Sequence, residues 1–195
     1  MLSLSERLEK LEQDLLADPP RISAYHDLPF AIFHYPPKDE FRMRKQIKLL
    51  VTRLSNVGKS VHVISLARIL WQIIEEIEGL SAIVQEEKEF GFLRAQETVN
   101  ILLSDEDFMP IADELSKHLS TLNPKKDIVF LVRVGALGPA IYRSAKLLDE
   151  MHKKRILVPI ILFYPGTCEG ERNLRFLDLP TQENAGGYSY RVKIY

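Results

Sequence analysis

The chain has 195 residues, but it contains only one cysteine, Cys168, and no long hydrophobic run. A single cysteine cannot form an internal disulfide, and it gives no support to a structural zinc site. The longest apolar run, residues 156–164, is far shorter than the roughly 20 residues of a membrane-spanning helix. The first ten residues also lack the basic start and apolar core of a signal peptide. We therefore expect a cytoplasmic protein.

The chain also lacks an excess of either charge. It has 26 basic and 27 acidic residues, and its formal net charge is −1. This balance argues against a protein that binds nucleic acid over its whole surface. Apolar residues make up 46% of the chain, which is enough for a buried core, and the length fits a single domain with extensions.

A short motif, Gly58-Lys59-Ser60, matches the end of a phosphate-binding P-loop. A P-loop follows a strand and precedes a helix, so that the helix N-terminus holds the phosphates. Here the surrounding pattern predicts a helix before the motif and a strand after it. In addition, Arg53 stands where the P-loop pattern requires its first glycine. We interpret the motif as a helix stop followed by a turn, and we predict no ATP hydrolysis.

Hydrophobic periodicity predicts an α/β fold. Strands are expected at residues 28–35, 59–66, 127–134, 156–164, 174–179 and 188–195, with helices between the earlier ones. This order predicts an open, mostly parallel sheet flanked by helices, finished by antiparallel C-terminal strands. The helical segments at about residues 80–123 are too long for one crossover and predict a helical insertion. Residues 21–195 would then form a single α/β domain.

Residues 1–20 are expected to form an amphipathic helical arm outside that domain. Ser3 and Glu6 fit a capping box at its start. One apolar stripe is formed by Leu4, Leu8, Leu11 and Leu15. Two interpretations remain open: the stripe packs on the chain's own core, or it binds a partner.

A second helix is expected at residues 38–54, with Ile47, Leu50, Val51 and Leu54 on its inward face. Its other side carries a basic face made of Arg42, Arg44, Lys45, Lys48 and Arg53. This face is either an ordinary solvated surface or a docking site for an acidic partner or for the phosphate backbone of DNA.

The most plausible place for a small ligand is the turn from Arg133 to Gly138. A buried strand ends there, Gly135 and Gly138 allow the backbone to turn, and the N–H groups of the next helix could hold an anion. The alternative is a tight turn in which Arg133 pairs with a carboxylate. The histidines are scattered, and the acidic residues 105–107 fit the start of a helix. We therefore predict no metal, no cofactor and no catalytic set.

Four stretches of the chain together resemble the BrxB family of bacterial BREX phage-defence systems. They cover most of residues 28–195 and read LPFAIFHYPPKDEFRMRKQIKLLVTRL, RVGALGPAIYRSAKLLDEM, VPIILFYPGTCEGERNLRFLDL and GYSYRVKIY. The resemblance implies a cytoplasmic component of a multi-protein system that methylates host DNA and blocks unmethylated phage. It implies no established activity. By analogy, the family's α/β character also suggests a degenerate nucleotide-binding-like fold that has lost its phosphate loop.

The resemblance further implies neighbours in the system: a PglZ-type phosphatase-like protein, a large ATPase and a DNA methyltransferase. Our first hypothesis is a non-catalytic adaptor that binds the PglZ-type protein directly. The second is a nucleotide or anion sensor, or a cryptic enzyme, that uses the Arg133–Gly138 turn. The third is a DNA-contacting subunit that uses the basic face of residues 42–53.

Overall fold

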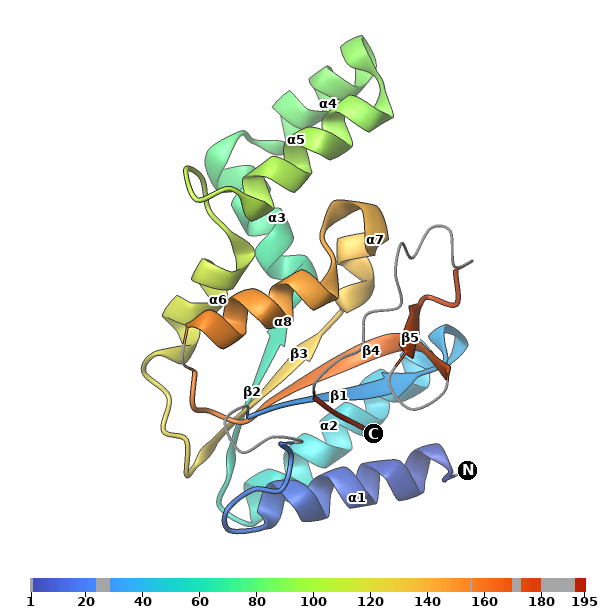
Figure 1. The fold of residues 1–195 in the computed structure, drawn as a ribbon, viewed down its shortest axis with the longest axis vertical. Helices are drawn as coiled ribbons and strands as arrows, with labels where there is room; N and C mark the ends of the chain where they lie inside the picture. Colours follow the sequence, from blue (N-terminus) through green and yellow to red (C-terminus); the bar gives the residue numbers. More distant parts are fainter. Residues whose placement is uncertain (1, 24–28, 155, 170–172, 180–191) are drawn as a thin grey trace. The chain divides into compact units, whose positions relative to one another are not determined.

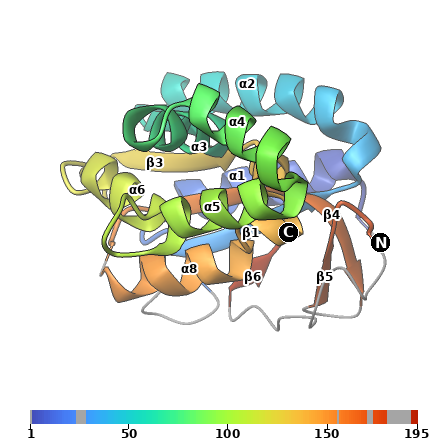
Figure 2. The same ribbon diagram turned by 90° about the horizontal axis from the view of Figure 1, so that it is seen from above.

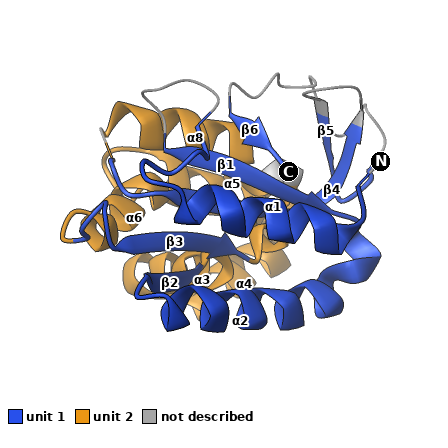
Figure 3. Ribbon diagram, turned by 90° about the horizontal axis from the view of Figure 1, so that it is seen from below, with its two compact units in different colours: residues 1–64, 122–132, 157–195 blue, residues 65–121, 133–156 orange. Residues whose placement is uncertain are grey.

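The fold was obtained as a computed structural model, which describes residues 2–23, 29–154, 156–169, 173–179 and 192–195. The chain divides into two compact units (Figure 3). Unit 1 comprises residues 1–64, 122–132 and 157–195, and unit 2 comprises residues 65–121 and 133–156. The predicted boundary at residue 20 does not separate the units, because the N-terminal helix lies within unit 1.

Unit 1 is a sheet with helices on one face (Figures 1 and 3). Its helical elements are α1 (Leu4–Leu16), the 3₁₀ turn η1 (Pro37–Asp39) and α2 (Glu40–Asn56). Its strands are β1 (Phe30–Tyr35), β2 (Ser60–Ser65), β3 (Asp127–Val132), β4 (Ile160–Glu169), β5 (Asn173–Phe176) and β6 (Lys193–Ile194).

The sheet has the strand order β2-β3-β4-β1-β6, and β5 pairs with β4. β1 runs parallel to β4, with Phe30 opposite Ile160, and β3 also runs parallel to β4. The prediction of an open, mostly parallel sheet flanked by helices is confirmed. Antiparallel pairing at the C-terminal end holds for β5, which lies beside the end of β4 (Figure 2). It does not hold for β6, which pairs parallel to β1 at the opposite edge.

The core of unit 1 lies between this sheet and the two helices α1 and α2. Both helices contribute every third or fourth residue, and the strands contribute alternate residues, as their periodicities require. The main members are Leu8, Leu11, Leu15, Phe33, Met43, Ile47, Leu50, Leu54, Phe130 and Phe163. Phe163 makes a tilted contact with Phe33 and an edge-to-face contact with Phe130. The inward face predicted for the helix at residues 38–54 is therefore confirmed.

Unit 2 is helical among its described residues. It consists of α3 (Leu66–Ile77), α4 (Leu80–Phe90), α5 (Phe92–Ser104), α6 (Ile111–Leu119), η2 (Val134–Leu137), α7 (Gly138–Ile141) and α8 (Ser144–Lys153). α4 packs on α5, α5 also contacts α3 and α7, and α6 contacts α8. None of the helices in the described part of the chain is both long and apolar enough to cross a bilayer.

Three local predictions need correction. The acidic residues 105–107 do not start a helix, because they follow the end of α5 at Ser104 and the next helix begins only at Ile111. The helix expected after the Arg133–Gly138 turn is interrupted at Tyr142, whose backbone is extended. The strand expected at residues 156–164 begins later and runs further, because Gly166 and Cys168 lie in the second half of β4, which pairs with β5. The predicted strand at residues 188–195 lies largely outside the described residues.

Candidate functional site

The outward face of α2 is a surface on which charged and apolar side chains meet. Phe41, Lys45 and Leu49 are spaced four residues apart, so they form one row along the helix, and Lys48 lies beside it. Phe41 and Leu49 are 74% and 53% exposed. Lys45 and Lys48 are exposed, and neither forms an ion pair with a described residue. We call Phe41, Arg42, Lys45, Lys48 and Leu49 the α2 face.

Two of the predicted basic residues lie beside the α2 face and have intramolecular partners. Arg44 Nε donates to Glu40 Oε1 at 2.8 Å, and its guanidinium lies over the Phe41 ring at 5.0 Å. Arg53 Nε donates to Glu12 Oε2 on α1 at 2.7 Å. These pairs reduce the charge that Arg44 and Arg53 can present to a partner. The structure therefore narrows the predicted basic face to Arg42, Lys45 and Lys48.

The leucine stripe of α1 is not a free surface. Leu8, Leu11 and Leu15 are buried in the core of unit 1, and Leu4 packs against that core. The partner-surface interpretation of these residues is thus corrected, because the side chains needed for it are already covered by the sheet and α2. The capping box is present: Ser3 Oγ accepts from the Glu6 N–H, and Glu6 Oε2 accepts from the Ser3 N–H.

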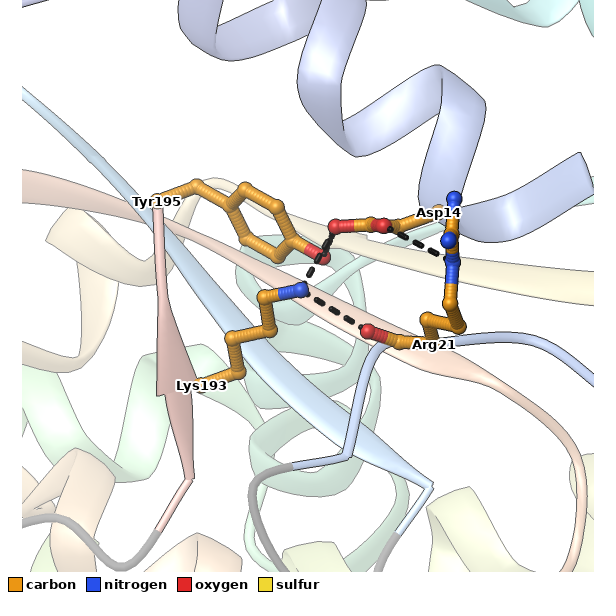
Figure 4. Close-up of polar contacts among 4 residues, drawn as sticks. All are labelled: Asp14, Arg21, Lys193 and Tyr195. Carbon is orange, nitrogen blue, oxygen red and sulfur yellow. Dashed lines mark hydrogen bonds and ion pairs between the residues drawn. The ribbon is translucent and has the colours of Figure 1, made fainter. Parts of the chain in front are cut away.

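A polar cluster around the buried Asp14 joins the end of α1 to the C-terminal strand (Figure 4). The Asp14 carboxylate accepts from Lys193 Nζ at 2.6 Å and from the Tyr195 hydroxyl at 2.8 Å. Arg21 Nε lies 3.4 Å from the other carboxylate oxygen. Lys193 Nζ also donates to the Arg21 carbonyl at 2.9 Å. We call Asp14, Arg21, Lys193 and Tyr195 the clasp.

The electrostatics of the clasp favour a charged Asp14. Burial by itself would raise the pKa of Asp14, but the hydrogen bonds from Lys193 and Tyr195 outweigh it, so that the pKa lies below its ordinary value. Burial and the nearby carboxylate raise the pKa of the Tyr195 hydroxyl. Asp14 lies in the last turn of α1, where the helix dipole disfavours an anion, so the cations are needed. The cluster therefore has a structural role.

Arg7 makes a second connection between α1 and the sheet. Its guanidinium donates to the carbonyl oxygens of His34 at 2.9 Å and Tyr195 at 3.1 Å, and it lies over the Phe33 ring at 5.2 Å. The His34 ring contacts the Gly166 carbonyl at 3.3 Å, and burial lowers the pKa of His34. Arg7 and the clasp therefore hold α1 at both ends.

The turn at Arg133–Gly138 lies in unit 2. Arg133 and Gly138 have positive φ angles, 60° and 53°, and Val134–Leu137 form a 3₁₀ turn. Arg133 is exposed, and no carboxylate of the described residues pairs with it, so the pairing expected in the alternative interpretation is not found. The following helix, α7, is only four residues long. Of the two glycines, Gly138 has the positive φ that the turn requires, whereas Gly135 lies within the 3₁₀ turn. Anion binding at Arg133, Gly135 and Gly138 stays a prediction.

Two other kinds of chemical site were expected to be absent, a metal centre and a reactive cysteine. Within the described ranges, no group of three or more His, Cys, Asp or Glu side chains is placed to hold a metal ion. Burial raises the pKa of the Cys168 thiol, which disfavours the reactive thiolate.

The GKS motif lies between a helix and a strand, as predicted. α2 ends at Asn56, Gly58 has a φ of 85°, and β2 begins at Ser60. Lys59 Nζ donates to the Lys125 carbonyl at 2.9 Å. The lysine side chain therefore links the turn after α2 to the turn before β3.

Lys59→Ala is expected to be nearly silent. The lost hydrogen bond is exposed, and a surface change of this kind usually alters stability by less than about 0.5 kcal/mol. Thermal melting and a phosphate-release assay with ATP measure the two effects, and we expect no turnover for either protein. ATP turnover in the wild type that is lost in Lys59→Ala would contradict this interpretation.

Comparison with known proteins gives the family. The sequence profile of the family described as "BREX protein BrxB" matches residues 62–194. A relative with that description from Bacillus cereus (strain H3081.97) is 31% identical over 150 residues, covering 74% of each chain. Another from Escherichia coli O9:H4 (strain HS) is 24% identical over 145 residues, covering 74% of this chain and 69% of the relative. No solved structure is significantly similar to this chain.

Proposed function

The chain belongs to the BrxB family of BREX proteins, a component of an anti-phage defence system, and from this premise we propose that it is a non-catalytic assembly component. Its α2 face binds another member of the system, and the first choice is the PglZ-type phosphatase-like protein. A cytoplasmic location is part of the proposal, because a system that methylates host DNA acts where that DNA lies.

The observation that carries the proposal is the combination of side chains on the α2 face. Two large apolar side chains, Phe41 and Leu49, are exposed in one row with Lys45 between them. Protein interfaces combine an apolar centre with a polar rim and are enriched in aromatic residues and arginine. A face of this kind fits a protein surface that offers apolar contacts and negative charge.

The same face is less suited to DNA. Contacts to the phosphate backbone come from cations and hydrogen-bond donors, and they use no exposed leucine or phenylalanine. Three cations, Arg42, Lys45 and Lys48, would also give only weak binding at physiological salt. The large ATPase and the methyltransferase remain alternative protein partners, and direct DNA contact is an outcome that the experiment below separates.

Lys45→Glu combined with Lys48→Glu is expected to weaken binding to the PglZ-type protein by about tenfold or more at 0.15 M salt. Both lysines are exposed, so the melting temperature stays close to that of the wild type. Higher salt narrows the difference in affinity between the wild type and this variant, since screening weakens the attraction between the wild-type lysines and the partner. This pair is preferable to one that includes Arg44, whose charge Glu40 already compensates.

The matched control is Lys10→Glu combined with Lys153→Glu. Both lysines are exposed and belong to other helices, α1 and α8, and the net-charge change is the same. Each protein is titrated against the isolated PglZ-type protein and against duplex DNA. A loss confined to the PglZ-type protein supports the proposal, and a loss confined to DNA favours the DNA-contacting subunit. Wild-type affinity in both titrations would show that the face is only a solvated surface.

A further inference from the structure

The helical hairpin of unit 2 carries large exposed apolar side chains at its tip. α4 ends at Phe90, Gly91 makes the turn, and α5 begins at Phe92 (Figure 1). Phe90, Phe92 and Leu93 are 69%, 62% and 77% exposed. Single exposed apolar residues are normal on protein surfaces, but a group of large ones marks an interaction site.

The tip is not part of the core of unit 2. The inward sides of the two helices are occupied by Ile83, Ala95 and Val99, which are buried. α4 packs mainly on α5, whereas α5 also contacts α3 and α7. The side chains at the tip can therefore be replaced without opening a cavity.

Polar contacts join the two helices of the hairpin. Gly91 has a φ of 89°, which glycine adopts without strain and other residues rarely adopt. Arg94 on α5 lies 3.3 Å from Glu86 on α4, and Thr98 Oγ1 donates to the same carboxylate at 2.9 Å. These bonds join the two helices, so the exposed group is presented by a preorganised element, which reduces the entropy lost on binding.

The charges around the tip are mostly negative. Residues 86–97 include four glutamates, at positions 86, 87, 89 and 97, but only two cations, Lys88 and Arg94. Arg94 is already engaged by Glu86 and Glu97. Glu87 and Glu89, both exposed, border the apolar tip, so a binding partner meets a negative rim. This sign is opposite to that of the α2 face.

We infer that residues 90–93 form a docking tip for a protein that presents an apolar groove bordered by basic side chains. The apolar group fills the groove, and Glu87 and Glu89 face its basic rim. Because the α2 face is basic, the two surfaces suit different partner surfaces. The hairpin therefore gives this chain a second binding surface, independent of the function proposed for α2.

The experiment places the photo-crosslinking residue p-benzoylphenylalanine at position 92, in cells that carry the whole BREX operon. The matched control has the same residue at Ser81, at the other end of the hairpin. We expect one crosslinked protein at position 92, with at least about tenfold higher yield than at position 81. Mass spectrometry is expected to map the crosslink to a segment rich in lysine or arginine. Glu87→Lys combined with Glu89→Lys is expected to reduce the yield by about tenfold.

Several results would overturn the inference: no crosslinked product, a product with a second copy of this chain, a product on an acidic segment, or a yield unchanged by the charge reversal. Position 93 replaces position 92 if the first crosslinker variant melts below the wild type. A crosslinker at Leu49 reports on the α2 face in the same cells. A crosslinked product from position 49 without one from position 92 contradicts only the hairpin inference. A product from position 92 without one from position 49 contradicts only the proposed function of the α2 face.

Discussion

Leu11→Ala is expected to lower the free energy of unfolding by about 3 kcal/mol. Leu11 lies on α1, and its side chain is fully buried in the core that α1 and α2 form with the sheet of unit 1. Alanine removes apolar contacts and leaves a cavity that the neighbouring side chains fill only in part. Urea denaturation at neutral pH, followed by circular dichroism, measures the change.

Leu16→Ala is the matched control, because Leu16 lies on the same helix and is 39% exposed. Its effect is expected to stay within about 0.5 kcal/mol. Deleting residues 1–20 removes three buried leucines together with Asp14, the carboxylate of the clasp, and we expect the truncated chain to lose its cooperative transition. A cooperative melt of the truncated chain, together with equal effects of Leu11→Ala and Leu16→Ala, would show instead that α1 is a separable arm.

Asp14→Ala is expected to destabilise the protein by about 2 kcal/mol at neutral pH. The change leaves Lys193 without its carboxylate and the Tyr195 hydroxyl without its acceptor. The estimate lies below the usual cost of breaking a fully buried pair, because the Lys193 side chain is partly exposed and keeps its bond to the Arg21 carbonyl. Glu9→Ala, an exposed acidic residue on the same helix, is the control.

The pH dependence of this effect has a definite sign. The pKa of Asp14 is lowered in the folded protein, so its contacts stabilise the fold at pH values above the unfolded-state pKa of about 4. This contribution is lost as the pH falls through the lower folded-state pKa. The difference in unfolding free energy between wild type and Asp14→Ala should therefore shrink in acid. A double-mutant cycle with Lys193→Met isolates the pair, and a coupling near zero would contradict the role of the clasp.

Much of the secondary structure can be predicted from hydrophobic spacing. The segments at residues 66–77 and 92–104 are helices because their apolar residues recur at steps of three and four. The segment at residues 127–132 is a strand because it is almost wholly apolar and is buried within a parallel sheet. The false P-loop was also recognisable, since it depends only on the order of the local elements.

Contacts between distant residues could not be predicted in this way. Asp14 and Lys193 are far apart in the chain, and no spacing rule joins them. The same applies to the parallel pairing of β6 with β1, which depends on the path of the chain before it. The leucine stripe of α1 shows a related limit, because an amphipathic pattern indicates an apolar contact but not whether it is intramolecular.

Some features of the candidate site could be predicted from the sequence, and others could not. The spacing of Arg42, Lys45 and Lys48 placed them on the exposed side of a helix, and the structure agrees. It could not show that Arg44 and Arg53 pair with Glu40 and Glu12, because these contacts depend on side-chain direction and on the packing of α1. Phe90 and Phe92 are visible in the sequence on either side of Gly91, but the sequence does not indicate that their side chains are exposed.

The function that we propose for this chain is the assembly of other BREX components. Affinity purification of the tagged protein from cells that carry the whole operon tests it most directly. We predict that the PglZ-type protein copurifies at a fixed stoichiometry and is depleted when Lys45 and Lys48 are replaced by glutamate. A lone protein that retains a nucleotide would contradict the claim and favour a sensor.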